Sequence, residues 1–321
     1  MTYPAFIALA LFVAGAQTPA WGQDYPSRPI RLLVGFPPNG AADIVARVLA
    51  RPLSERFRQQ VVIDNRPGAG SVLASEIVAK AAPDGHTLVM ISSSHAASAG
   101  LYKTLPYDPV KDFAPVILVA SSAQAFVANA SFPGKSVADV IALAREKPGQ
   151  LNFGSGGNGS TTHLAGELLN RMANIRLTHV PYKGAAPALA AVLAGEIQLV
   201  FSSLPGALGQ IRAGKVKGIA VTSVTRARSA PDIPTIAESG VPGYEATNWF
   251  GILAPRATPR AIVALLNAEV SRLLSVAEVA DSITRQGADP LGSTPSEFEG
   301  YLKTEIDKWT KLIREANLRV E

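Results

Sequence analysis

Cysteine is absent from all 321 residues of the chain. This absence excludes a disulfide framework, a thiolate nucleophile and a lipid anchor on cysteine. Charged residues make up only 17% of the sequence. They form neither a long run nor a basic stripe interleaved with aromatic residues, so we expect no nucleic-acid partner. The net charge of +5 favours anionic partners only weakly.

Charged side chains are also missing from the first 22 residues. The apolar run Ala5–Ala16 is too short to span a bilayer but suits the core of a signal peptide. Small residues in Ala20-Trp21-Gly22 precede Gln23, so we expect residues 1–22 to be a cleaved signal peptide and the mature protein to be soluble in the periplasm, without a lipid anchor. Because no lysine or arginine precedes the run, an apolar N-terminus of a cytoplasmic protein stays open as the alternative.

Strand and helix patterns alternate in two successive units. In the first, strands at Ile30–Phe36, Val61–Ile63 and Thr87–Ser92 enclose helices at Ala41–Phe57 and from Ser71 to about Ala82. This order predicts parallel strands joined by right-handed crossovers. The same alternation starts again near residue 136 and continues to about residue 222.

Two amphipathic helices, Arg260–Leu274 and Pro295–Ala316, end the chain without a sheet of their own. We expect them to pack on the first unit, so that the chain crosses between units twice. The predicted fold is α/β and two-lobed, a clamshell in which each lobe is a mostly parallel sheet flanked by helices and two crossing segments form the hinge. We expect the lobes to be residues 23–121 with 249–321, and residues 122–248. Such folds bind ligands between the lobes, beyond the carboxyl ends of the strands.

The segment "FGSGGNGSTTHL" carries glycines at 154, 156 and 159, with the spacing of a dinucleotide-binding loop. That motif needs an acidic residue about 20 positions later to hold the ribose, and here the region reads "RLTHVPYKG". We therefore expect no nucleotide. Glycines, hydroxyls and a helix start instead favour an anion site. Its candidate residues are Ser155, Gly156, Asn158, Gly159, Ser160 and Thr161.

Two further segments present polar groups at predicted strand ends of the first unit. "FPPNGAAD" contains Asn39 and Gly40, which suit a tight turn, while Asp43 is expected to cap the helix. "ISSSHAAS" presents Ser92, Ser93, Ser94 and His95 at the same edge. A donor-rich loop from each lobe predicts a small ligand with a negative group at each end, such as a dicarboxylate.

Catalytic and metal motifs are missing. The four histidines show no ligand spacing, and no G-x-S-x-G nucleophile elbow occurs. We expect no metal, no cofactor and no enzyme, although a triad of distant residues cannot be seen in sequence. His163 either faces the ligand or has no contact with it, as a histidine on the helix surface or packed inside the lobe.

The whole set of segments resembles the Bug family, the TctC-like periplasmic solute receptors of tripartite tricarboxylate transporters. The resemblance covers nearly all of residues 25–316, and its segments are "YPSRPIRLLVGFPPNGAADIVAR", "VVIDNRPGAG", "KAAPDGHTLVM", "YDPVKDFAPV", "LNFGSGGNGSTTHLAGEL", "HVPYKGAAPAL", "DIPTIAESGVPGYEATNWFGILAP" and "TPSEFEGYLKTEIDKW".

The resemblance implies a binding protein of the type II clamshell class that captures a small carboxylate, either a di- or tricarboxylate or an aromatic acid, through amides, hydroxyls and water. It adds further candidate ligand residues: Phe36, Pro37, Asn39, Gly40, Ala41 and Tyr182. Ser93 and Ser94, from the polar strand end, and Ser202, where the chain departs from the family, complete the candidate set. The alternative for Tyr182 is a structural role, in packing at the hinge or at the edge of the sheet.

The chain departs from the family pattern at three positions. Asn39 stands where glycine is usual, His86 where tyrosine is usual, and Ser202 where many relatives carry an acidic residue. The last change argues for a plain carboxylate over an amino acid.

The resemblance implies delivery of the ligand to integral membrane transporter subunits by a monomer. A receptor that signals to a membrane sensor without transport needs the same cavity, so the sequence leaves that alternative open. An enzyme that converts the bound ligand is the less favoured third alternative.

Overall fold

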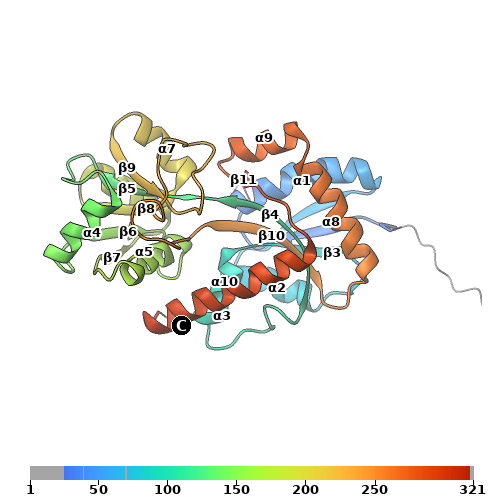
Figure 1. The fold of residues 1–321 in the computed structure, drawn as a ribbon. Coiled ribbons are helices and arrows are strands. Elements are labelled where there is room, and N and C mark those ends of the chain that lie inside the picture. Colours follow the sequence, from blue (N-terminus) through green and yellow to red (C-terminus); the bar gives the residue numbers. More distant parts are fainter. Residues whose placement is uncertain (1–24, 39, 69–70, 319–321) are drawn as a thin grey trace, which may run out of the picture.

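The computed structural model describes residues 25–38, 40–68 and 71–318, which form two α/β lobes side by side (Figure 1). The expected signal peptide and Asn39 lie outside the described residues. Among the described helices, none has both the length and the apolar character needed to cross a bilayer.

Lobe 1 is built on a six-stranded sheet with the order β11-β4-β10-β3-β1-β2. Its strands come from both ends of the chain: β1 (Ile30–Val34), β2 (Val61–Asn65), β3 (Thr87–Ser92), β4 (Phe113–Ser122), β10 (Asn248–Pro255) and β11 (Asp289–Pro290).

Helices cover both faces of this sheet, which explains why β1 reads as a continuous apolar run. The helices on one face are α1 (Ala41–Phe57), α8 (Arg260–Leu274) and α9 (Ala277–Arg285), and those on the other are α2 (Val72–Ala79), α3 (Ser93–Leu101) and α10 (Pro295–Glu315). Leu32 and Val34 pack against the first face, whereas Leu33 between them packs against the second.

Lobe 2 is built on a five-stranded sheet with the order β7-β6-β8-β5-β9. Its strands are β5 (Gln124–Asn129), β6 (Asn152–Ser155), β7 (Thr178–Pro181), β8 (Leu199–Ser203) and β9 (Val216–Val221). Residues of α4 (Val137–Glu146) and α5 (Thr161–Met172) pack on one face, and residues of α6 (Ala185–Ala194) and α7 (Leu204–Arg212) on the other.

The chain crosses between the sheets twice, once from β4 to β5 and once from β9 to β10. The two-lobed α/β fold predicted from the sequence is confirmed, but each sheet is mixed and not mostly parallel. In the described part of the chain, every antiparallel pair involves β4, β5 or β10. β5 and β10 each enter their sheet from the other lobe, so no helical crossover within the sheet imposes a parallel direction on them. β4 leaves lobe 1 toward lobe 2 and pairs antiparallel with β10 on one side and with β11 on the other.

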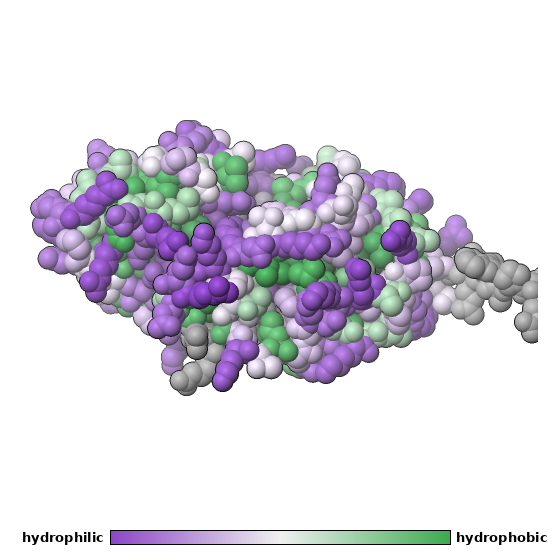
Figure 2. All heavy atoms as spheres, turned by 60° about the horizontal axis from the view of Figure 1, so that its bottom comes forward, coloured by the Kyte–Doolittle hydropathy of each residue, from purple (hydrophilic) through white to green (hydrophobic). Residues whose placement is uncertain are grey.

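α10 extends from lobe 1 to lobe 2 along one side of the molecule (Figure 1). A capping box between Thr294 and Glu297 fixes its start. Near its end, Glu315 pairs with Arg171 of α5 at 2.8 Å. Figure 2 views the molecule from this side, where hydrophilic side chains cover most of the surface and hydrophobic ones gather between them. One apolar core continues beneath α10 from Leu33 in lobe 1 to Phe153 in lobe 2.

Candidate functional site

A cavity of about 360 Å³ lies between the lobes. Lobe 1 lines it through the loop after β1 and through α3, lobe 2 through the loop between β6 and α5, and β10 through its first residue. The lining residues are Phe36, Ser92, Ser94, Ser98, Leu101, Tyr102, Asn158, Gly159, Ser160, Thr161 and Asn248. Both predicted lobes therefore contribute to one cavity of a size typical for small ligands.

Ser92 forms the first polar corner of the cavity because it caps α3. Its backbone is extended, and its hydroxyl accepts a hydrogen bond from the amide of Ser94 at 3.3 Å. The hydroxyls of Ser92 and Ser94 lie 3.0 Å apart. Since Ser98 follows Ser94 by four residues, both lie on the same face of the helix.

Asn248, at the start of β10, supplies an amide whose orientation is fixed. Its Oδ1 accepts a 2.7 Å hydrogen bond from the hydroxyl of Ser93. The Nδ2 group is consequently the end of this side chain that remains as a hydrogen-bond donor. Ser93 itself is buried and does not line the cavity, so the structure gives it a supporting position.

The glycine-rich loop before α5 uses most of its own donors internally. The amide of Gly156 donates to Oγ1 of Thr162 at 2.8 Å, and that of Gly157 to Oγ of Ser155 at 3.1 Å. The amide of Gly159 donates to Nδ1 of His163 at 3.0 Å. This differs from the expectation that the glycine amides face a ligand, because inward-turned side chains satisfy them first.

Thr161 and Asn158 therefore provide the donors of this loop that remain for a ligand. Thr161 is the first residue of α5, and Ser160 caps the helix by accepting from the amide of His163 at 3.2 Å. The amide of Thr161 belongs to the first turn, whose N–H groups have no partner within a helix. In the described part of the chain, neither the Thr161 hydroxyl nor the exposed Asn158 amide side chain has a hydrogen-bond partner.

Phe36 lines the cavity from the loop after β1, and its carbonyl is held by a buried network. Nδ2 of Asn65 donates to the Phe36 carbonyl at 3.0 Å and to Oδ1 of Asp43 at 2.8 Å. Asp43 is fully buried and also accepts from Arg47, contacts that are structural, while its capping of the helix stays a prediction. Of the other residues predicted here, Pro37, Gly40 and Ala41 do not line the cavity.

Four predicted residues of lobe 2 lie outside the cavity wall. Ser155 is buried and contacts His179, and Gly156 is held by Thr162. Tyr182 packs against the core under α6, with its ring near Gly154. Ser202 is buried in β8 opposite Ala125.

The sequence did not identify four residues that line the cavity: Ser98, Leu101, Tyr102 and Asn248. Three of them belong to α3 or follow it directly. A serine four residues after Ser94 was the only sequence signal for Ser98. His95, predicted at this edge, is instead buried and stacked on Tyr107.

No residue lining the described cavity carries a charged side chain. Two helix starts, of α3 and α5, contribute partial positive charge to it. The described residues contain no group of three or more histidines and carboxylates that could hold a metal ion. The arrangement can bind an anion through hydroxyls, amides and helix ends without a cation from the protein.

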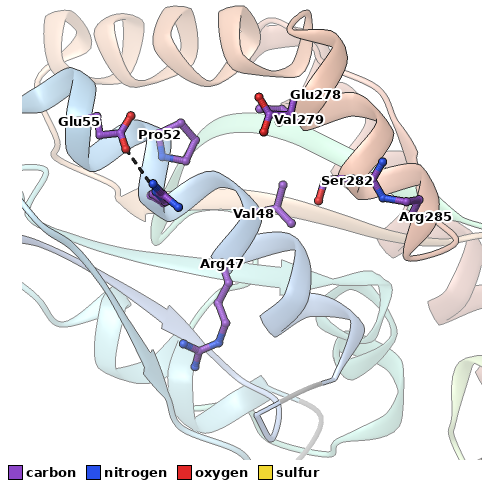
Figure 3. A pocket seen from close by; sticks show the side chains of 9 residues that line it. Arg47, Val48, Pro52, Glu55, Glu278, Val279, Ser282 and Arg285 are labelled. Atoms are coloured by element: carbon purple, nitrogen blue, oxygen red, sulfur yellow. Dashed lines mark hydrogen bonds and ion pairs between the residues drawn. The ribbon is translucent and has the colours of Figure 1, made fainter.

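A larger groove of about 420 Å³ lies between α1 and α9 on lobe 1 (Figure 3). It contains charges of both signs, including the ion pair of Arg51 and Glu55 at 3.3 Å. Lobe 2 contributes no residue to it, and none of the predicted ligand residues lines it. The smaller cavity between the lobes is therefore the better candidate.

Known proteins resemble this chain over nearly its whole length. The model of the tripartite tricarboxylate transporter family receptors matches residues 45–318. The chain belongs to this family. It is 35% identical to Protein BugT of Bordetella pertussis over 319 residues, 99% of this chain and 98% of that protein. The predicted relation to the Bug family is thus confirmed.

Solved structures of other proteins share the fold. R. palustris Rpa4515, solved with adipate, has a TM-score of 0.78 and 38% identity, covering 92% of this chain and 100% of that one. MatC from Rhodopseudomonas palustris, solved with bound malate, has a TM-score of 0.74 and 34% identity, covering 90% and 100%. Both of those proteins were thus solved with a dicarboxylic acid.

Proposed function

We propose that this protein is a periplasmic receptor that binds a small organic acid between its lobes and delivers it to a tripartite tricarboxylate-type membrane transporter. The acid is a di- or tricarboxylate or an aromatic acid. The observation that carries the proposal is the uncharged cavity wall, which places hydroxyl and amide donors at the starts of α3 and α5. Adipate and malate in the two related structures support the same ligand class.

In this proposal one carboxylate lies at the start of α5 against Thr161 and Asn158. The other end of the ligand meets Asn248 and the serines of α3, while Phe36 and Tyr102 flank its carbon chain. Charge-assisted hydrogen bonds from neutral donors hold the carboxylate, and each is worth about 1.5–3 kcal/mol. The lobes that close on it are residues 23–121 with 249–321, and residues 122–248.

Ligand binding is tested by thermal unfolding of protein that has been denatured, dialysed and refolded to remove retained ligand. Adipate, malate, citrate and benzoate are added separately, and a ligand at 100 times its Kd should stabilise the protein by about 2.7 kcal/mol. Thr161→Val should raise the Kd of the bound acid by about 12- to 160-fold, the equivalent of one such hydrogen bond. The matched control is Thr304→Val, since Thr304 is exposed on α10. Absence of a shift with every acid would overturn the proposal.

Export and transport need their own measurements. Mass spectrometry of protein from the periplasmic fraction should find an N-terminus at Gln23. Cells lacking this chain should lose uptake of the acid identified in the binding experiment. Retained uptake, or full-length protein in the cytoplasm, would contradict these parts of the proposal.

A further inference from the structure

Two histidines stack behind the glycine-rich loop. The rings of His163 from α5 and His179 from β7 lie 3.7 Å apart between centroids and within 15° of parallel. His163 is 4% exposed, and Phe153 packs beside both rings. Neither histidine lines the cavity, so neither is explained by contact with a ligand.

His163 holds one end of the loop. Its Nδ1 accepts the amide hydrogen of Gly159 at 3.0 Å, which requires Nδ1 to carry no proton. Nε2 is then the protonated nitrogen of the neutral ring, and it faces Oε1 of Glu167 at 3.7 Å. Gly159 has a φ of +71°, a conformation that positions its amide toward the ring and that few other residues adopt.

His179 holds the other end. Its Nε2 shares a 2.6 Å hydrogen bond with the hydroxyl of Ser155, and the same hydroxyl oxygen accepts from the amide of Gly157. Burial first, and the neighbouring His163 second, lower the pKa of His179 to about 4. His179 is therefore neutral at neutral pH, and the charged group facing the pair is Glu167.

We infer that His163 and His179 act as positioning residues, a neutral stacked pair that holds residues 155–160 in the form that presents Asn158 and Thr161 to the ligand. Because it concerns the loop of the same cavity, the inference rests on the proposed function. It assigns to the histidines a task different from packing: packing needs only their volume, whereas positioning needs a hydrogen-bond acceptor at Nδ1 of His163 and a polar partner at Nε2 of His179.

The test uses variants that separate volume from hydrogen bonding. His163→Leu fills the space but offers no acceptor, whereas His163→Asn places an oxygen near the position of Nδ1. Likewise His179→Leu removes the partner of Ser155, and His179→Gln retains one near Nε2. We expect the leucine variants to raise the Kd of the bound acid by about tenfold or more and the amide variants by less than about threefold. His86→Leu serves as the control, because His86 is a buried histidine of lobe 1 outside the cavity wall.

A second readout does not depend on any ligand. In protein labelled with ¹⁵N-histidine, the spectrum of His163 should show an unprotonated Nδ1 and a protonated Nε2. In protein labelled with ¹⁵N-glycine, the Gly159 amide should shift in His163→Leu. A proton on Nδ1 of His163 would overturn the inference. Retained affinity in the leucine variants would also overturn it, since that result shows that the filled volume is sufficient. Equal loss of affinity in the leucine and amide variants would overturn it as well, because restoring the hydrogen-bonding atom would then have no effect. If wild-type protein binds no acid, the proposed function fails, and the tautomer and the Gly159 shift then decide the inference by themselves.

Discussion

Trp249 donates its indole hydrogen to Oε2 of Glu305 at 2.8 Å, where β10 re-enters lobe 1 beneath α10. The indole of Trp309 donates to the same oxygen at 3.0 Å, and Lys308 forms an ion pair with Oε1. Glu305 is only 2% exposed. One buried carboxylate therefore ties a crossing segment to the helix that extends over both lobes.

Replacing Glu305 should destabilise the fold strongly. Glu305→Leu leaves two buried indole N–H groups without an acceptor and Lys308 without its partner, a loss of about 3–5 kcal/mol. Glu305→Gln keeps an oxygen for the indoles and should cost less. Urea unfolding followed by tryptophan fluorescence measures the difference. The control is Glu299→Leu on the exposed side of α10, where the loss should stay below about 1 kcal/mol. Similar losses in both leucine variants would contradict this account.

Gly287 contacts lobe 2 from the turn before β11. A Cβ at this position would overlap the ring of Pro205 at the start of α7. We expect Gly287→Ala to push the lobes apart, increase the radius of gyration in small-angle scattering and weaken ligand binding. Gly292→Ala is a matched control, since its φ of +83° is as unfavourable for alanine as the +76° of Gly287 but its surroundings are open. If both variants behave alike, backbone strain and not the lobe contact is responsible.

Stability should fall as the pH drops from about 6.5 toward 4. Burial lowers the pKa of His95 to about 4, below the 6.5 of an unperturbed histidine, so the unfolded state binds the proton first. The stabilisation is complete above pH 6.5, and roughly 2–3 kcal/mol of it is lost by pH 4.5 through His95 alone. His179 contributes in the same direction. Urea unfolding at a series of pH values measures the slope, which should become shallower in His95→Phe. An unchanged slope in that variant would exclude His95 as a source.

A negative charge at Asn248 should abolish ligand binding. Asn248→Asp has nearly the same shape and keeps an acceptor for the Ser93 hydroxyl, but it replaces the Nδ2 donor by an anionic oxygen. A carboxylate ligand would then face a like charge in a cavity without cationic lining, and we expect its Kd to rise about 100-fold or more. Isothermal titration measures this, with the exposed Asn174→Asp of lobe 2 as the control. Retained affinity in Asn248→Asp would remove this side chain from the site.

Much of the fold follows from the sequence where one periodicity dominates a segment. The bounds Ala41–Phe57 predicted for α1 and Arg260–Leu274 predicted for α8 are those of the structure. α3 was missed because Ser93–Leu101 consists mostly of small residues, which give no helical apolar pattern. α9 was missed because only Ile283 of its nine residues is buried.

The site was predicted less completely, for a related reason. Glycine and hydroxyl content identified the loop before α5, but the sequence could not show which of these groups satisfy each other within the loop. Asn248 lies about 90 residues after that loop, and only the crossing of β10 into lobe 1 brings the two together. Tyr102 depends in the same way on α3, which positions it at the cavity.

An arginine in the cavity would both attract an anion from a distance and hold it by hydrogen bonds. Because the cavity wall is uncharged, attraction and holding depend on different parts of this protein. Hydrogen bonds from hydroxyls and amides act only at contact distance and are little affected by dissolved salt. Long-range attraction of an anion comes instead from the net charge of +5 spread over the whole chain. Ionic strength should therefore slow the arrival of the acid without shortening its residence, and retention in the receptor should be nearly the same in dilute and in saline surroundings.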